Sequence, residues 1–147
     1  MKIEIKNTIG TPIITFSNFK KGSIEPFIFI NFLTSVNING FEAKSNILVE
    51  LTDISEMLAN LKVLNESLKR IFFFQHNDKY FTIKFEPNTT GQIMITGNLR
   101  SEDYSSRLEF KFEMGQELLP ELINQCEEVV NRFTKDSQID KYLYLNN

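Results

Sequence analysis

A thiol and an imidazole are the side chains of this sequence best suited to covalent catalysis, and each occurs once, as Cys126 and His76. Such a pair can act as a nucleophile and its base when a third group, here Asp78, orients the imidazole. The neighbouring residues favour a structural interpretation. Cys126 falls on the apolar face of a predicted helix, where cysteine packs as a small hydrophobic residue, and His76 falls in a polar turn. We therefore expect no catalytic residues and a protein that is not an enzyme.

Metal and nucleotide chemistry also lack their usual residues. One histidine and one cysteine exclude multi-histidine sites and cysteine-based zinc sites, although metal binding by carboxylates alone stays open. The adjacent Glu102 and Asp103 lie in a polar stretch, where no burial would raise a carboxyl pKa for acid catalysis. The six glycines form no G-x-G-x-x-G pattern and no glycine–lysine pair, so nucleotide binding is not indicated. We predict no cofactor and no metal.

Length and charge define the class of protein. The chain has 147 residues, of which 41% are hydrophobic and 24% charged, and this is typical of one globular domain over residues 1–147. Its 16 basic and 19 acidic residues give a net charge of -3, which does not favour nucleic acid as a partner. Neither a signal peptide nor an apolar stretch of membrane-spanning length is evident. The sequence therefore predicts a cytoplasmic protein with no membrane anchor.

Alternating apolar residues predict the strands that would position any site. Two short strands are expected at 3–5 and 13–16. A long hairpin follows, with strands at 28–38 and 41–51 joined by Asn39-Gly40, a dipeptide that suits a type I′ turn. Further strands are expected at 71–74, 81–86, 93–99 and 107–114.

Two stretches have the spacing of amphipathic helices. The first is expected to begin at Asp53, whose carboxylate can cap free N–H groups while Glu56 reciprocates, and to end near Arg70. The second covers about residues 118–133 and has Pro120 in its first turn, where a missing N–H costs little. Each helix has one apolar face that must be buried.

The order of these elements predicts the fold class. Most links between strands are too short for a crossover helix, so the sheet is expected to be antiparallel. We therefore predict an α+β fold, in which two amphipathic helices pack on an antiparallel sheet of hairpins and meanders. The tail, residues 136–147, either frays or adds a short strand at 142–145.

Two features of the surface could bind a partner. The second helix has a polar stripe opposite its apolar face, which could steer a basic protein by complementary charge. The stripe consists of Glu117, Glu121, Gln125 and Glu128. Phe27 and Phe29 have the parity opposite to the main apolar face of their strand, so a helix or a partner must cover them. The 14 phenylalanines also leave open a Phe-lined cavity for a small molecule or lipid, although core packing accounts for most of them.

Four segments form a pattern that is similar to a known family. They are the hairpin end Asn37-Ile38-Asn39-Gly40-Phe41, the helix Asp53-Ile54-x-x-Met57-Leu58-x-x-Leu61, the strand 91–99, and Leu108-x-Phe110-x-Phe112 leading to Gln116-x-Leu118. Over about residues 25–133 the chain resembles the WapI-type immunity proteins of bacterial polymorphic-toxin systems. The resemblance implies a small cytoplasmic protein that binds the toxic C-terminal domain of a cognate toxin and blocks it without chemistry of its own. It assigns no binding residues.

Overall fold

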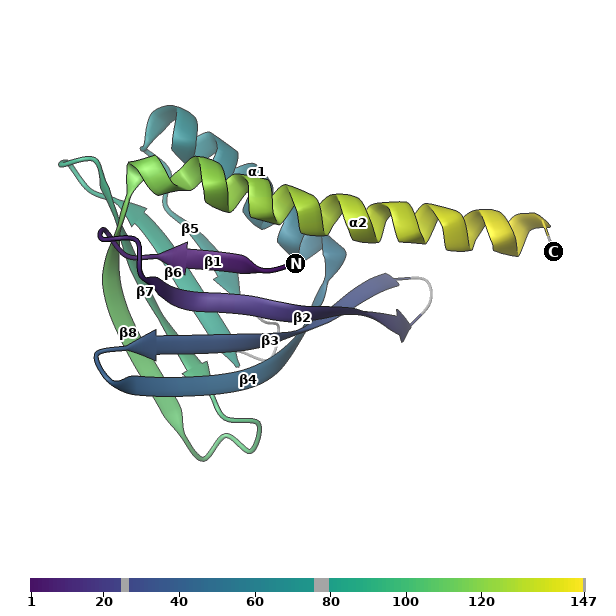
Figure 1. Cartoon of the computed structure of the whole chain (residues 1–147), viewed down its shortest axis with the longest axis horizontal. Coiled ribbons are helices and arrows are strands. Elements are labelled where there is room, and N and C mark those ends of the chain that lie inside the picture. Colours follow the sequence, from purple (N-terminus) through teal and green to yellow (C-terminus); the bar gives the residue numbers. More distant parts are fainter. Residues whose placement is uncertain (25–26, 76–79, 147) are drawn as a thin grey trace.

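The fold consists of two four-stranded antiparallel sheets and two long helices in the part of the chain that the structure describes (Figure 1). This computed structural model describes residues 1–24, 27–75 and 80–146. The first sheet contains β1 (Ile3–Lys6), β2 (Pro12–Ile24), β3 (Phe27–Ile38) and β4 (Phe41–Glu50). The second contains β5 (Phe72–Gln75), β6 (Phe81–Pro87), β7 (Gln92–Arg100) and β8 (Arg107–Gly115). The helices are α1 (Leu51–Ser67) and α2 (Leu119–Asn146), and a short 3-10 turn, Gln116–Leu118, precedes α2.

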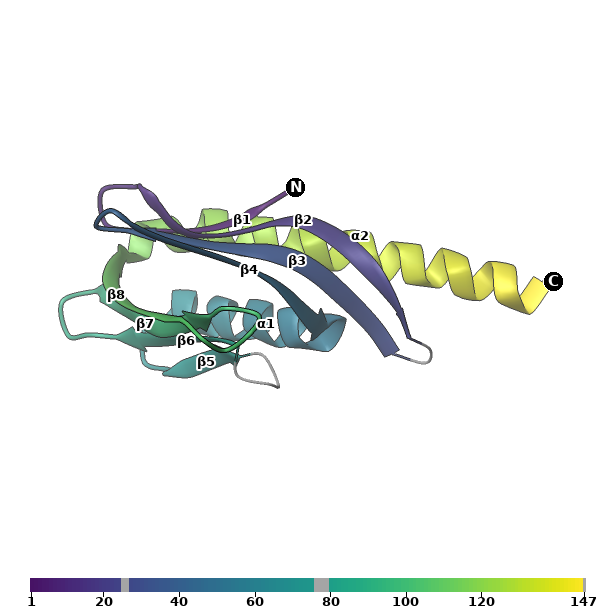
Figure 2. The same cartoon turned by 90° about the horizontal axis from the view of Figure 1, so that it is seen from below.

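The α+β class predicted from the sequence is confirmed, but the strands form two sheets where one was expected. Each sheet is a meander, with the strands side by side in chain order. Figure 2 shows the sheets as two layers. α1 lies between β4 and β5 in the chain, and its length carries the polypeptide from one layer to the other. β4 and β5 consequently end their own sheets without pairing with one another.

Aromatic side chains join the two layers. The ring of Phe16 on β2 lies 5.0 Å from that of Phe32 on β3, within the first sheet. The same ring lies 5.9 Å from Phe74 and 5.6 Å from Phe81, both on the second sheet. Aromatic pairs at these separations add to the stabilisation that their burial provides. Phe16 and its neighbours therefore form the centre of a core that belongs to both sheets.

The β3–β4 hairpin has the turn that its sequence predicts. Asn39 and Gly40 have φ angles of 52° and 83°, and the strands pair directly on either side, with Ile38 opposite Phe41. Positive φ at both central residues is the requirement of a type I′ turn. β2 is longer than expected, because the predicted strand at 13–16 continues to Ile24 beyond an irregularity between Ser17 and Lys20.

α1 begins at Leu51, two residues before the predicted start at Asp53. Glu50 is the N-cap, and Asp53 is the third helical residue, whose carboxylate accepts a hydrogen bond from the Glu50 backbone N–H at 3.0 Å. The capping box is therefore formed by Glu50 and Asp53, and the predicted pairing of Asp53 with Glu56 is wrong. The helix ends at Ser67, where Leu68 adopts a left-handed φ of 50°.

α2 packs beside α1 and along β1 (Figure 1). Lys62 on α1 and Glu127 on α2 form an ion pair at 2.8 Å. The backbone of α2 continues to Asn146 and includes residues 142–145, so the short strand considered for them is not formed. Among the described residues, no helix is long and apolar enough to span a membrane.

Candidate functional site

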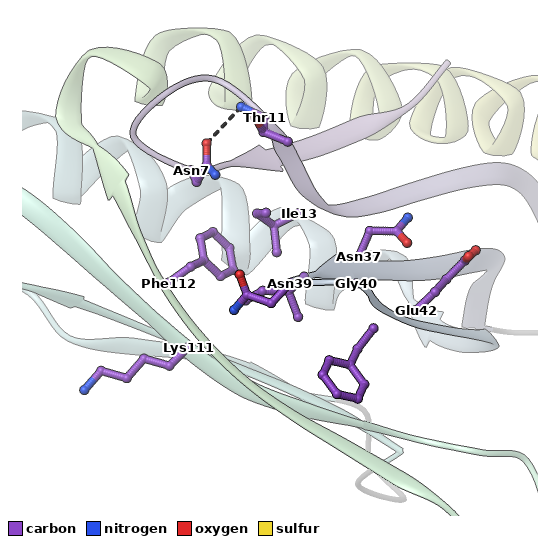
Figure 3. Close-up of a pocket in the computed structure, with 11 residues that line it drawn as sticks. Asn7, Thr11, Ile13, Asn37, Asn39, Gly40, Glu42, Lys111 and Phe112 are labelled. Carbon is purple, nitrogen blue, oxygen red and sulfur yellow. Dashed lines mark hydrogen bonds between the residues drawn. The ribbon is translucent and has the colours of Figure 1, made fainter.

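A groove lies where one end of the first sheet meets β8 (Figure 3). It has a volume of about 520 Å³. One wall is the loop between β1 and β2, in which the Asn7 side-chain oxygen accepts hydrogen bonds from the backbone N–H groups of Ile9 at 3.2 Å and Thr11 at 2.9 Å. The second wall is the β3–β4 turn, and Lys111 and Phe112 of β8 form the third. Local turn chemistry therefore positions two of the three walls.

The groove is suited to binding rather than to proton transfer. Its polar groups include the amides of Asn7, Asn37 and Asn39, the hydroxyl of Thr11 and the carboxylate of Glu42, whereas the amine of Lys111 points away from these side chains (Figure 3). Glu42 already forms an ion pair with Lys44 at 3.0 Å. No nucleophile stands beside a base among these lining residues, so the groove offers hydrogen bonds and apolar contacts.

Two phenylalanines line this groove. They test the alternative function, in which a Phe-lined cavity binds a small molecule or lipid. They are Phe112, which is partly buried, and Phe41, which is 67% exposed. Phe41 shares the parity of the buried residues of β4, but it directly follows the β3–β4 turn and stays exposed. Most other rings pack against one another in the core, as Phe72 and Phe85 do at 4.5 Å. The phenylalanine content therefore reflects core packing and gives the ligand-binding alternative no specific support.

The cysteine of the sequence-based catalytic hypothesis is inside the core. Cys126 is fully buried in α2, as its helical position predicted. Burial raises the pKa of its thiol to about 12, with a smaller contribution from the charge of Glu127. A nucleophilic cysteine needs a lowered pKa and access to solvent, and Cys126 has neither. His76 and Asp78 lie outside the described residues.

The adjacent carboxylates Glu102 and Asp103 lie in the exposed loop between β7 and β8. Asp103 accepts hydrogen bonds from the Ser105 hydroxyl at 2.7 Å, the Ser105 backbone N–H at 2.9 Å and the Ser101 hydroxyl at 2.7 Å. These bonds, with that of the Ser105 hydroxyl foremost, lower the pKa of Asp103 to about 2. General acid catalysis requires a shift in the opposite direction. Asp103 therefore organises the loop.

The predicted stripe on α2 divides into two kinds of residue. Glu121 forms an ion pair with Lys6 at 3.1 Å, and Gln125 accepts a hydrogen bond from the backbone N–H of Glu4 at 2.8 Å. Both contacts fix α2 to β1. Glu117 and Glu128 are exposed, and a role for the stripe in binding a partner stays a prediction.

An apolar patch lies on the outer face of the β2–β3–β4 sheet, and we call it the hairpin patch. It consists of Phe27, which is 57% exposed, Leu48, which is 38% exposed, and the half-buried Phe29. Gly22 on β2 lies between Phe29 and Leu48 and has no side chain that would separate them. A Cβ at Gly22 would lie 3.4 Å from Phe29 Cβ and 3.5 Å from Leu48 Cδ1. The parity of Phe27 and Phe29 predicted this outward direction. Leu48 was missed because it lies on the polar face of its strand.

Comparison with known families decides what kind of protein this is. The model of the WapI-like immunity protein family matches residues 29–134. The chain belongs to the WapI-like immunity protein family. The resemblance seen in the sequence is thereby confirmed. No curated protein and no solved structure matches the chain.

The region shared with the WapI-like family begins in β3 and ends in α2, so it includes all of the second sheet and, of the hairpin patch, Phe29 and Leu48 but not Phe27. It leaves β1 and all of β2 outside. Among the residues that the structure describes, no group of three or more His, Cys, Asp or Glu side chains is arranged to hold a metal ion.

Proposed function

We propose that this protein is an immunity protein that neutralises a cognate bacterial toxin domain by binding to it, without catalysis. The observation that carries the proposal is the family match over residues 29–134. The chemistry of the surface supports it. The buried thiol of Cys126 and the loop-bound carboxylate of Asp103 are poor catalysts, whereas exposed apolar and acidic side chains are suited to a protein interface.

We place the toxin on the hairpin patch. Exposed aromatic side chains such as Phe27 are the usual anchors of a protein interface, because they bury a large area in a partner pocket with little loss of conformational freedom. The ring of Phe29 lies 6.4 Å from that of Phe27, and Phe29 and Leu48 both lie beside Gly22, so the three side chains form one apolar surface. The polar stripe of α2, with Glu117 and Glu128 exposed, is the proposed second contact and would attract basic groups of the toxin.

Co-expression in a bacterial host tests the proposal. The candidate toxin is the protein encoded by the neighbouring gene, and its C-terminal domain is expressed alone and together with the present protein. We expect the domain alone to stop growth, co-expression to restore growth, and the two proteins to elute together in size-exclusion chromatography. Growth arrest that persists while the present protein accumulates in folded form would exclude the proposal, as would a neighbouring domain that is not toxic.

A further inference from the structure

β8 is an edge strand of the second sheet, and it differs from the other edge strands of the described structure. β8 pairs with β7 over nine consecutive residue pairs from Arg107 to Gly115, without a bulge. It contains no proline, and no described strand pairs with its other side. A long, regular border strand presents N–H and C=O groups that can pair with another strand.

The side chains of β8 alternate strictly between the two faces of the sheet. Those on the outer face are all charged and exposed, namely Arg107, Glu109, Lys111 and Glu113. Those on the inner face are apolar, namely Leu108, Phe110, Phe112 and Met114. The order of charges along the outer face is plus, minus, plus, minus.

We propose that β8 pairs antiparallel with β8 of a second copy of this chain, with Phe110 opposite Phe110, so that two copies share one continuous eight-stranded sheet. In this register Arg107 lies opposite Glu113, and Glu109 lies opposite Lys111. Twofold symmetry repeats both pairs, so all four outer positions face a residue of opposite charge. Such cross-strand pairs stabilise a sheet. In this register odd-numbered residues pair with odd-numbered ones and even-numbered with even-numbered ones, so the apolar residues of both copies stay on the inner face.

The charge pattern also selects this register over its neighbours. A shift that places Lys111 opposite Lys111 brings Glu109 opposite Glu113. A shift in the other direction places Glu109 opposite Glu109 and Arg107 opposite Lys111. Like charges directly opposite one another are destabilising. The register centred on Phe110 is therefore favoured over both of these alternatives.

The other edge strands of the two sheets, β1, β4 and β5, are less suited to pairing with a second copy. Along β1, Gln125 of α2 already accepts the backbone N–H of Glu4 at 2.8 Å. β5 has only four residues. β4 lacks the alternating charges of β8, because its exposed positions 46 and 48 are Asn and Leu.

Apolar side chains beside β8 support the same partner. A groove of about 340 Å³ runs between the β3–β4 turn and β8, and its apolar walls are formed by Ile38, Phe41, Leu108 and Phe110. Phe41 is 67% exposed there. A strand added to β8 brings its own inward residues to this groove, because Leu108 and Phe112 of one copy lie opposite Phe112 and Leu108 of the other. The exposed ring of Phe41 then gains apolar neighbours.

Sedimentation equilibrium of the purified protein, over a range of concentrations, tests the inference without any toxin. We expect a monomer–dimer equilibrium that 1 M NaCl shifts toward the monomer, because salt screens exposed charge pairs. Glu109→Lys and Lys111→Glu each create two like-charge pairs across the twofold axis. We expect each variant alone to dimerise at least about tenfold more weakly.

Two combinations of these variants distinguish pairing of β8 from a general effect of charge. The double variant Glu109→Lys/Lys111→Glu exchanges the two charges and should dimerise as the original protein does. A mixture of the two single variants should form a heterodimer, because one then presents two lysines and the other two glutamates at these positions. Formation of the heterodimer in the mixture also shows that the single variants fold.

Glu86→Lys is the matched control. Glu86 lies on the same face of the second sheet and forms an ion pair with Lys84 at 3.2 Å, much as Glu109 pairs with Arg107, but β6 is two strands away from β8. Its variant should dimerise normally. A wild-type protein that stays monomeric at every concentration would overturn the inference, as would single variants that dimerise unchanged or a double variant that stays monomeric.

Discussion

Gly97 is the residue at which the second sheet has the least room. It lies on β7 opposite Ile83 of β6 and Phe110 of β8. A Cβ at this position would overlap the Thr82 carbonyl oxygen and lie 2.8 Å from Phe110 Cζ. The sequence showed a glycine within a strand, which indicates a bulge or a close approach, and only the packed structure shows that close approach is the reason.

We predict that Gly97→Ala destabilises the protein by about 2–3 kcal/mol, because the obstacle includes backbone that cannot move away easily. The free energy of unfolding in urea measures the loss. Gly22→Ala on β2 is the control, since its Cβ would find ordinary contacts at 3.4 Å or more, and it should change the stability by less than about 1 kcal/mol. Equal free energies of unfolding for Gly97→Ala and Gly22→Ala would contradict the explanation that close packing requires glycine at position 97.

Asp103 makes the pH dependence of one loop predictable. Because the pKa of Asp103 is lowered from 3.8 to about 2, the hydrogen bonds to its carboxylate contribute stability above its ordinary pKa, and this contribution is lost as the pH falls through about 2. Ser105→Ala removes the foremost cause and should raise the pKa toward 3.8. A carbon-13 NMR titration of the Asp103 carboxyl group measures it. Ser106→Ala, which keeps the bonds to Asp103, should leave the titration unchanged, and the same midpoint in both variants would refute this explanation.

At the level of elements, the sequence predicted whether a segment is a helix or a strand better than it predicted the residues at which that element begins and ends. The spacing of Ile54, Met57 and Leu58 fixed the apolar face of α1, and all three residues are buried. The start of α1 was misplaced because three acidic residues at 50, 53 and 56 offer two capping pairs with the same spacing. The second half of β2 was missed because Lys20, Lys21 and Ser23 look like loop residues, whereas pairing with β3 keeps them extended.

The contact of α2 with β1 could not be predicted from the spacing along α2. Gln125 appeared to belong to a solvated stripe, yet its side chain accepts the Glu4 backbone N–H. We predict that Gln125→Ala destabilises the protein by about 1 kcal/mol and increases hydrogen exchange at the Glu4 amide, as NMR can measure. Asn124→Ala, at an exposed neighbouring position of the same helix, should change neither quantity. Unchanged exchange at Glu4 in the Gln125 variant would show that this bond does not protect the border of the sheet.

At the scale of the whole molecule, the sequence predicted the fold class but not the division into two sheets. Alternation shows which face of a strand is buried, and it does not show which strands are neighbours. Phe16 contacts Phe32 in its own sheet and Phe74 and Phe81 in the other sheet. Its contacts with both sheets could not be predicted without knowing that there are two. The hairpin patch was predictable in part, because Phe27 and Phe29 broke the parity of their strand.

The hairpin patch gives a test of how the whole protein binds its toxin. We predict that Phe27→Ser weakens binding to the toxin domain at least about tenfold, because an aromatic anchor is lost, and changes the free energy of unfolding by less than about 1 kcal/mol. Isothermal titration calorimetry with the purified domain measures the affinity. Phe73→Ser is the matched control, since Phe73 is also 57% exposed but lies on the second sheet. Equal losses in both variants would remove the patch as the docking face.

The position of β1 between β2 and α2 also determines when the domain can finish folding. The bond from Glu4 to Gln125 joins residues that are 121 positions apart, so a chain emerging from the ribosome has its earliest strand long before the helix that borders it. β1 can pair with β2 soon after both emerge, but its other side stays uncovered until translation has passed residue 125. Contacts of such long range form slowly. Completion of this domain is therefore a late event that cannot precede the synthesis of α2.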